Sequence, residues 1–287
     1  MLQEELLKQI RLIDLKVRRQ VESSLQGSYH TLFKGHGLEF QEVREYVEGE
    51  DVRLMDWNVT ARMGRPFVRV YREERELTVM VVVDVSASTL FGRAWSGREV
   101  AATLGAALAF SAIRNNDKAG LILFSDRIEG YIPPRRGRNH LLTIIRALLT
   151  TPAKGRRTDP DIPFRFINKA MKKKSLLFFL SDMQFGPLPD SAAVAARRHE
   201  IVPVAIFDRM SYAPERNAFV RTRDPESGMA RVLDLSVSAE GRWDHVRKEK
   251  EDAFKRIGSL PIWIENQAEF INDLVLGFKK MQRKGAR

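Results

Sequence analysis

The 287-residue sequence contains no cysteine. That absence excludes disulfide-stabilised scaffolds, thiolate metal sites and cysteine nucleophiles. Apolar runs are also short, because a stretch such as residues 79–83 falls far below the ~18 residues that a membrane-spanning helix needs. The N-terminus lacks the basic segment followed by an apolar segment that marks a signal peptide. Together these absences predict a cytoplasmic protein.

Positive charge is in excess: 48 Lys and Arg residues against 37 Asp and Glu residues give a formal net charge of +11. Hydrophobic residues make up 44% of the chain and are interleaved with charged ones, as in folded globular proteins. The length allows one large domain with appendages, or two small domains.

The first part of the chain divides into two regions. Residues 1–27 predict an amphipathic helix, because leucine, isoleucine and valine recur at three- and four-residue steps among charged side chains. Residues 28–76 are irregular and end in a strand-like run after Pro66. This second region predicts a separate small element.

The main domain is predicted at residues 77–210, where apolar, β-branched runs alternate with amphipathic segments. The apolar runs predict buried strands at 77–83, 119–124, 176–180 and 201–207. The segments between them predict helices at 97–114, 139–149, 161–174 and 191–199. This alternation favours right-handed βαβ units, and therefore an α/β fold with a doubly wound, mostly parallel sheet.

Residues 211–287 predict a C-terminal extension of the same fold. A turn-forming stretch at 224–228 lies between two strand-like runs, which is typical of a β-hairpin. A further strand is predicted at 261–265 and a last amphipathic helix at 269–281.

Polar side chains follow two of the predicted strands. Asp84, Ser86 and Ser88 alternate directly after the first buried strand, and Asp182 follows the third. The carboxyl ends of the strands in an open α/β sheet share one edge, and Thr158 lies in a polar loop expected there. Carboxylate and hydroxyl oxygens are hard ligands that suit Mg²⁺ or Mn²⁺. The sequence therefore predicts a divalent-cation site.

The same five residues resemble the metal-ion-dependent adhesion site of von Willebrand factor A-like (vWA) domains. That pattern is Asp-x-Ser-x-Ser, then a loop Thr, then an Asp after the fourth strand, here Asp84, Ser86, Ser88, Thr158 and Asp182. The resemblance implies a vWA-like fold and a cation that recognises an acidic residue of another protein. The alternative is that Asp84 and Ser86 only satisfy the N-terminal amides of the following helix.

A second pattern lies in the small element. It comprises Glu39-Phe40, Arg44, Tyr46, Gly49-Glu50-Asp51, Arg53, Asp56-Trp57 and Ala61-Arg62. The pattern resembles the signature of the bacterial and archaeal domain-of-unknown-function fifty-eight (DUF58) proteins, although Glu50 stands where the signature has Asp.

The signature residues are interpreted as structural. Arg53 is expected to pair with Asp51, Asp56 or Glu45. Tyr46 and Trp57 are expected to anchor the small element on the sheet domain. Arg44 belongs to the same structural set. A catalytic role for Asp51 and Asp56 is the weaker alternative, because no positioned nucleophile or base accompanies them.

The family resemblance also implies a partner. Such proteins are typically encoded beside MoxR-type AAA+ ATPases and are thought to act with them as adaptors in the maturation or remodelling of other proteins. The function expected here is a non-enzymatic, metal-dependent interaction module that binds the ATPase, or a client protein that offers an acidic residue.

Several arginines are expected near the metal end of the sheet, where positive potential would speed encounter with an acidic partner. They are Arg135, Arg136, Arg138, Arg156 and Arg157. The alternative is an ordinary solvated basic face.

Two other function classes stay open. Nucleic-acid binding is permitted by the basic runs at 172–174 and near the C-terminus, but no aromatic interleaving or DNA- or RNA-binding signature accompanies them. A Mg²⁺-dependent phosphohydrolase using Asp84 and Asp182 is the other, although the sequence lacks a phosphate-binding loop and a nucleophile elbow.

Overall fold

The computed structural model describes residues 39–72, 77–90, 96–206, 219–223, 230–234, 240–265 and 269–285. The chain forms two compact units. One is Phe33–Leu77, and the other contains the remaining residues, including Thr78–Arg287. The helix predicted at 1–27 lies outside the described residues.

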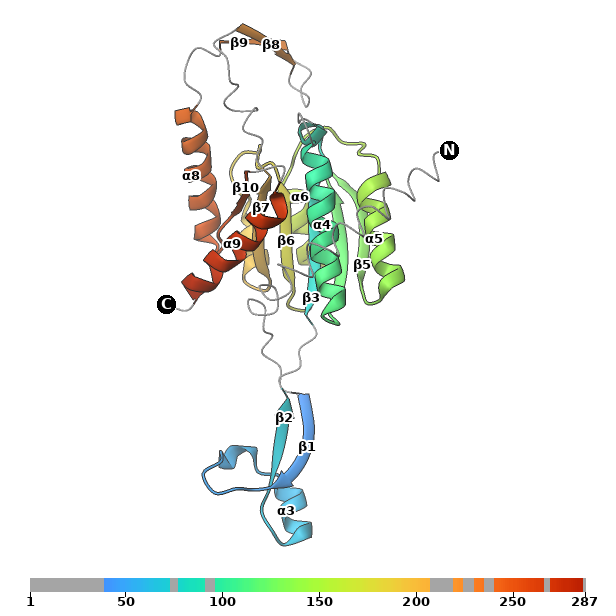
Figure 1. Cartoon of the computed structure of the whole chain (residues 1–287), viewed down its shortest axis with the longest axis vertical. Helices are drawn as coiled ribbons and strands as arrows, with labels where there is room; N and C mark the ends of the chain where they lie inside the picture. Colours follow the sequence, from blue (N-terminus) through green and yellow to red (C-terminus); the bar gives the residue numbers. More distant parts are fainter. Residues whose placement is uncertain are drawn as a thin grey trace. The chain divides into compact units, whose positions relative to one another are not determined.

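A six-stranded sheet forms the centre of the larger unit (Figure 1). Its strand order is β10-β7-β6-β3-β4-β5, and every neighbouring pair is parallel except β4 and β5. In chain order the strands are β3 (Thr78–Asp84), β4 (Lys118–Phe124), β5 (Ile128–Arg135), β6 (Leu176–Ser181), β7 (Glu200–Ile206) and β10 (Ile262–Ile264). This is the mostly parallel, doubly wound α/β architecture predicted from the sequence, and it is consistent with a vWA-like fold.

Helices cover both faces of the sheet. They are α4 (Gly97–Arg114), α5 (Arg138–Thr150), α6 (Asp161–Ala170), α7 (Asp190–Ala196), α8 (Glu240–Arg256) and α9 (Phe270–Gly285). Side chains of a strand alternate between faces, so in β6 Phe178 meets Phe278 of α9, while Phe179 stacks with Phe164 of α6 and contacts Phe254 of α8. Burial on both faces explains why these strands are apolar at every position.

Strand β5 was not predicted, because Gly130 and the pair Pro133-Pro134 have the composition of a turn. Proline is tolerated there because β5 is an edge strand, and its pairing with β4 shifts register between Ala119 and Leu121. Helix α6 ends at Ala170, four residues earlier than predicted. The hairpin was predicted correctly: β8 (Phe219–Arg223) and β9 (Ala230–Asp234) pair antiparallel.

The smaller unit contains an antiparallel pair, β1 (Glu39–Glu45) and β2 (Phe67–Arg72). Between them lie the 3-10 helix η2 (Val52–Leu54) and the helix α3 (Trp57–Met63). Asp56 caps the N-terminus of α3, because its carboxylate accepts hydrogen bonds from the backbone N–H groups of Asn58 and Val59. The same carboxylate forms an ion pair with Arg69 at 2.8 Å.

Two expectations for the signature are corrected there. The cation that pairs with Asp56 is Arg69, not Arg53. Asp51 accepts the backbone N–H of Arg53 at 2.9 Å, and within the described residues the Arg53 side chain has no ion pair. Arg44 forms an ion pair with Glu50. Trp57 is 68% exposed, and its role with Tyr46 in anchoring this unit stays a prediction.

Candidate metal centre

The five predicted site residues come together at the carboxyl edge of β3 and β6. The hydroxyl of Thr158 donates to Ser86 Oγ at 2.8 Å, and Ser86 Oγ lies 3.0 Å from Ser88 Oγ. Ser88 also lies close enough to the Asp182 carboxylate to lower its pKa. Asp84 lies at the end of β3, two residues before Ser86. Side chains from three separate chain segments therefore converge on one point.

Asp84 is fully buried, and both of its carboxylate oxygens are held by the protein. Oδ1 accepts the backbone N–H of Ser86 at 2.9 Å, and Oδ2 accepts the hydroxyl of Ser181 at 2.8 Å. The hydrogen bond from the Ser86 N–H resembles the helix-capping role that is the structural alternative for Asp84. The Asp84 carboxylate is nevertheless buried at the edge of the sheet where the hydroxyl groups of Ser86, Ser88 and Thr158 gather. Ser181 was missed as a site residue, although its place directly before Asp182 was a signal.

Two acidic side chains, Asp84 and Asp182, share this edge. Burial, followed by repulsion from Asp182, raises the pKa of Asp84 to about 7. Burial also raises the pKa of Asp182. The Oδ2 atom of Asp182 is buried and has no hydrogen-bond partner within the described part of the chain. A divalent cation would satisfy this oxygen and relieve the repulsion, so the residues present fit such an ion.

Hydroxyl donors are essential to that fit. Among the described residues, no three Asp, Glu or His side chains gather into a metal cluster. A cation at this edge therefore depends on Ser86, Ser88 and Thr158 as well as on two carboxylates, which favours a hard ion such as Mg²⁺ or Mn²⁺.

Glu129 of strand β5 holds the loop that carries Thr158 in place. Glu129 Oε1 accepts the backbone N–H groups of Lys154 at 2.9 Å and Gly155 at 2.7 Å, and it also accepts the Ser125 hydroxyl. A Cβ atom on Gly155 would lie only 2.2 Å from Ser125 Oγ, so a side chain there would displace the loop. Glu129 and Gly155 were not predicted as site residues, because β5 itself was not predicted.

A buried lysine fixes the loop that follows Asp182. Lys250 of α8 is 5% exposed, donates to the carbonyl oxygens of Phe185 and Gly186, and lies 4.5 Å from the centre of the Phe185 ring. Burial lowers its pKa. The same loop contains Met183 at a positive φ of 59°, a conformation rare outside glycine. Nothing in the sequence linked Lys250 to the site, because the contact spans more than 60 positions.

Three of the five predicted arginines lie at the edge of the sheet opposite the candidate metal centre. Because β5 runs antiparallel to β4, its last residue, Arg135, pairs with Ala119 at the beginning of β4. Arg135 therefore lies at the amino edge of the parallel strands, opposite the metal centre, and Arg136 and Arg138 follow it directly. The prediction that Arg135, Arg136 and Arg138 lie near the metal centre is therefore wrong, because β5 runs antiparallel to the other strands.

The other two arginines are next to the metal centre. Arg156 and Arg157 are exposed in the loop that ends at Thr158. The carbonyl oxygen of Arg156 accepts the backbone N–H of Ala87 at 3.0 Å, which joins this loop to the Asp84–Ser88 segment. Contact of these side chains with a partner stays a prediction.

Known proteins similar to this chain are themselves uncharacterised. One uncharacterized protein of Mycobacterium bovis and one of Mycobacterium tuberculosis are each 30% identical to the chain over 289 residues. The match covers 96% of this chain and 90% of each relative.

Similar solved structures share low sequence identity with the chain. The conserved hypothetical protein BatB from Bacteroides thetaiotaomicron is 15% identical with a TM-score of 0.48, covering 72% of this chain and 99% of BatB. The SpRpn10 VWA domain is 12% identical with a TM-score of 0.37, covering 70% of this chain and 94% of that domain.

A third solved structure corrects the expected location. It is an aerotolerance-related membrane protein from Bacteroides fragilis, 17% identical with a TM-score of 0.43, and the match covers 72% of this chain and 99% of that one. The description of this neighbour as a membrane protein contradicts the predicted cytoplasmic location. Within the residues that the structure describes, no helix has the length and apolar character to cross a membrane.

The family assignment rests on the sequence. Residues 42–254 match the family described as "Protein of unknown function DUF58", and this range includes the signature from Arg44 to Trp57 and all five candidate metal ligands. The chain therefore belongs to the DUF58 family.

Proposed function

We propose that this chain is a non-enzymatic protein-interaction module that binds an acidic residue of a partner protein through a divalent cation. Asp84, Ser86, Ser88, Thr158 and Asp182 would hold the cation, which is Mg²⁺ or Mn²⁺. The bound ion would supply a positive centre that accepts a carboxylate oxygen from the partner.

One observation supports this proposal above the others: the Asp182 Oδ2 atom is buried without a partner beside a second buried acid and three linked hydroxyl groups. A buried carboxylate oxygen without a donor is costly, and a bound cation is one of the few groups that satisfies it. A purely structural role for Asp84 and Ser86 does not account for the unpaired oxygen of Asp182.

The chain's own groups suit recognition rather than bond breaking. Asp84 is held by Ser86 and Ser181, so its carboxylate is fixed in place as a ligand. The three hydroxyl groups are neutral and leave the ion with net positive charge for an incoming acid. No histidine stands among the five ligands or at the hydrogen bonds that fix them, and both carboxylates are assigned to the cation, so this proposal leaves no separate group as a general base.

The partner proposed for this site is a MoxR-type AAA+ ATPase, or a client protein of that ATPase with an exposed acidic residue. The family resemblance supports this choice, and the exposed Arg156 and Arg157 beside the metal centre suit an acidic partner surface.

Co-purification tests the proposed function. The full chain is expected to retain the MoxR-type ATPase of the same organism in Mg²⁺ and to release it in EDTA, and Asp84→Ala is expected to retain none in either buffer. Asp190→Ala provides the matched control, because Asp190 is an exposed acid at the start of α7 and lies outside the site. Retention that ignores both the chelator and the Asp84 substitution would refute metal-mediated capture.

The two groups of arginines provide a second test. Replacing Arg156 and Arg157 with alanine is expected to slow association with the captured partner several-fold at low salt and to flatten its salt dependence. Replacing Arg135 and Arg138 removes the same charge from the opposite edge and is expected to have a much smaller effect. The measurement is the association rate by surface plasmon resonance, and equal effects of both pairs would favour the solvated basic face instead.

A further inference from the structure

Lys250 of α8 is a buried cation that the proposed recognition of an acidic partner does not use. Its ammonium group donates to the carbonyl oxygens of Phe185 and Gly186, the latter at 2.9 Å. The Glu249 carboxylate lies 4.0 Å away, on a side chain that is 54% exposed. Burial of an ammonium group is costly, and here the two carbonyl groups and the Phe185 ring compensate for it. The charge of Lys250 therefore acts mainly on one loop.

That loop sets the position of the Asp182 carboxylate. Oδ1 of Asp182 accepts the backbone N–H of Gln184 at 3.0 Å. The Ser181 hydroxyl, which donates to Asp84, accepts the backbone N–H of Met183 at 3.0 Å. These two hydrogen bonds hold the turn so that Oδ2 of Asp182 is the oxygen left without a hydrogen-bond partner within the described part of the chain.

The turn needs support from outside its own residues. Met183 has a φ of 59°, which methionine rarely adopts because its Cβ atom crowds the backbone there. Phe185 provides one support, since its ring packs against Phe179 of β6 at 6.2 Å between ring centres. Lys250 provides another, because the two carbonyl groups that it binds lie only three and four positions after Asp182. Lys250 is thus placed to act on the Asp182 carboxylate through the backbone.

Helix α8 carries two rows of side chains with different contacts. Lys250 and Phe254 stand four residues apart in the first row, in which Phe254 packs against Phe179 at 6.4 Å between ring centres. The first row therefore meets the loop and the core. The second row comprises Arg247, Glu251 and Lys255.

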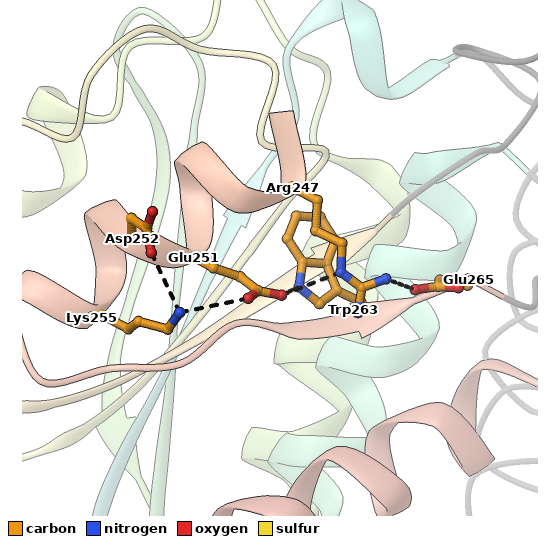
Figure 2. A network of polar contacts seen from close by, with 6 residues as sticks. All are labelled: Arg247, Glu251, Asp252, Lys255, Trp263 and Glu265. Carbon is orange, nitrogen blue, oxygen red and sulfur yellow. Dashed lines mark hydrogen bonds and ion pairs between the residues drawn. The ribbon is translucent and has the colours of Figure 1, made fainter. Parts of the chain in front are cut away.

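The second row joins α8 to β10 through the network in Figure 2. Glu251 Oε1 accepts the indole N–H of Trp263 and the Arg247 Nε–H, each at 3.2 Å. Arg247 also donates to Glu265 at 2.6 Å and lies over the Trp263 ring at 5.2 Å. These interactions hold the helix on the sheet, whereas those of Lys250 hold the loop on the helix. Substitutions in the two rows can therefore separate the two effects.

We propose that Lys250 is a positioning residue of the metal centre: by holding the carbonyl groups of Phe185 and Gly186, it keeps the Asp182 carboxylate directed at the cation. The inference rests on the proposed cation site and adds a residue of α8 to it. It does not depend on which partner protein binds. The network around Arg247 and Glu251 stabilises the packing of α8 on β10 instead.

Lys250→Met tests the proposal, because methionine keeps the length and the apolar stem of lysine but has no N–H to donate. Metal-free full-length protein is titrated with Mg²⁺ in a calorimeter. The variant is expected to bind the ion at least ~10-fold more weakly than wild type, since loss of a group that orients a metal ligand costs ~10–100-fold.

Arg247→Met is the matched control, because it removes a cation from the second row of the same helix. It is expected to lower the midpoint of urea unfolding and to leave the Mg²⁺ affinity unchanged. Should Lys250→Met not fold, Phe185→Leu is the second variant. It removes the ring that the Lys250 ammonium group faces, and it is expected to weaken Mg²⁺ binding in the same direction.

Double-mutant cycles show whether Lys250 acts through Asp182. The loss caused by Lys250→Met is expected to shrink in an Asp182→Asn background, because substitutions that act through one group are not additive. In a Thr158→Val background the loss is expected to persist in full, since Thr158 lies on the separate loop that Glu129 holds.

Three results would overturn the proposal and leave the metal centre standing: wild-type affinity in Lys250→Met, an equal loss of affinity in Arg247→Met, or a loss of full size in the Asp182→Asn background. The last two would show that the substitution disturbs α8 as a whole. If wild type itself binds no Mg²⁺, the proposed metal centre is refuted, and the role of Lys250 is refuted with it.

Discussion

Metal-free protein titrated with MgCl₂ is expected to bind one ion, and Asp84→Asn to bind it at least ~100-fold more weakly. Loss of an outer hydrogen-bond partner to a metal site costs ~10–100-fold, and loss of one of only two carboxylates should exceed that range. Asparagine has nearly the volume of aspartate and retains an oxygen that can accept the Ser86 backbone N–H, so the loop geometry should survive. Isothermal titration calorimetry measures the affinity and the number of ions.

Controls separate this effect from general disruption. Asp190→Asn removes an exposed acid outside the site and is expected to bind Mg²⁺ as wild type does. Thr158→Val keeps the shape of a ligand side chain but removes its hydroxyl, and it is expected to show an intermediate loss. Wild-type affinity in Asp84→Asn would end the assignment of this site as a metal centre.

Without metal, the stability of wild type relative to Asp84→Asn is expected to fall as pH rises from about 4 to about 7. The folded-state pKa of Asp84 is raised from the model-peptide value of 3.8 to about 7, mainly by burial and then by Asp182. Between these two values the folded protein retains a proton that the unfolded chain has lost. Stability decreases with pH wherever the folded state binds more protons, so the deficit develops across this window and is complete above it.

The expected result at pH 7.5 is therefore that metal-free Asp84→Asn unfolds at higher denaturant concentration than wild type, by a free energy on the order of 4 kcal/mol, because each unit of the pKa shift corresponds to ~1.4 kcal/mol. Saturating Mg²⁺ should stabilise wild type and leave the variant unchanged, because a ligand stabilises only the state that binds it. Urea unfolding at several pH values, with and without Mg²⁺, provides the measurement. Titrating groups that do not interact with Asp84 contribute equally to both proteins and cancel in the difference, whereas Asp182 interacts with Asp84 and its contribution is part of the measured effect.

This second prediction distinguishes function from structure at Asp84. If Asp84 served only to satisfy the backbone amide of Ser86, its replacement would destabilise the protein or leave stability unchanged. If metal-free Asp84→Asn were less stable than wild type at every pH, that result would contradict the interpretation that Asp84 and Asp182 repel each other in the absence of a cation.

Local sequence patterns predicted much of the larger unit. The helix predicted at 97–114 is α4 at Gly97–Arg114, and the apolar run that contains residues 79–83 is the buried central strand β3. These predictions succeed because the periodicity of a helix or a buried strand is contained within a few consecutive residues. Strand β5 was missed because local sequence does not show where a strand lies in the sheet. Its glycine and two prolines are tolerated only because it is an edge strand.

The sequence by itself predicted every strand of the six-stranded sheet except β5, the family, and the five residues that meet at the candidate metal centre, because strand ends in a parallel sheet share one edge. Only the tertiary structure decided that Arg135 returns to the opposite edge and that Glu129 and Lys250 hold the loops around the site. Each of these depends on which distant segments pack together. Strand order and helix packing set those contacts, and no local pattern encodes them.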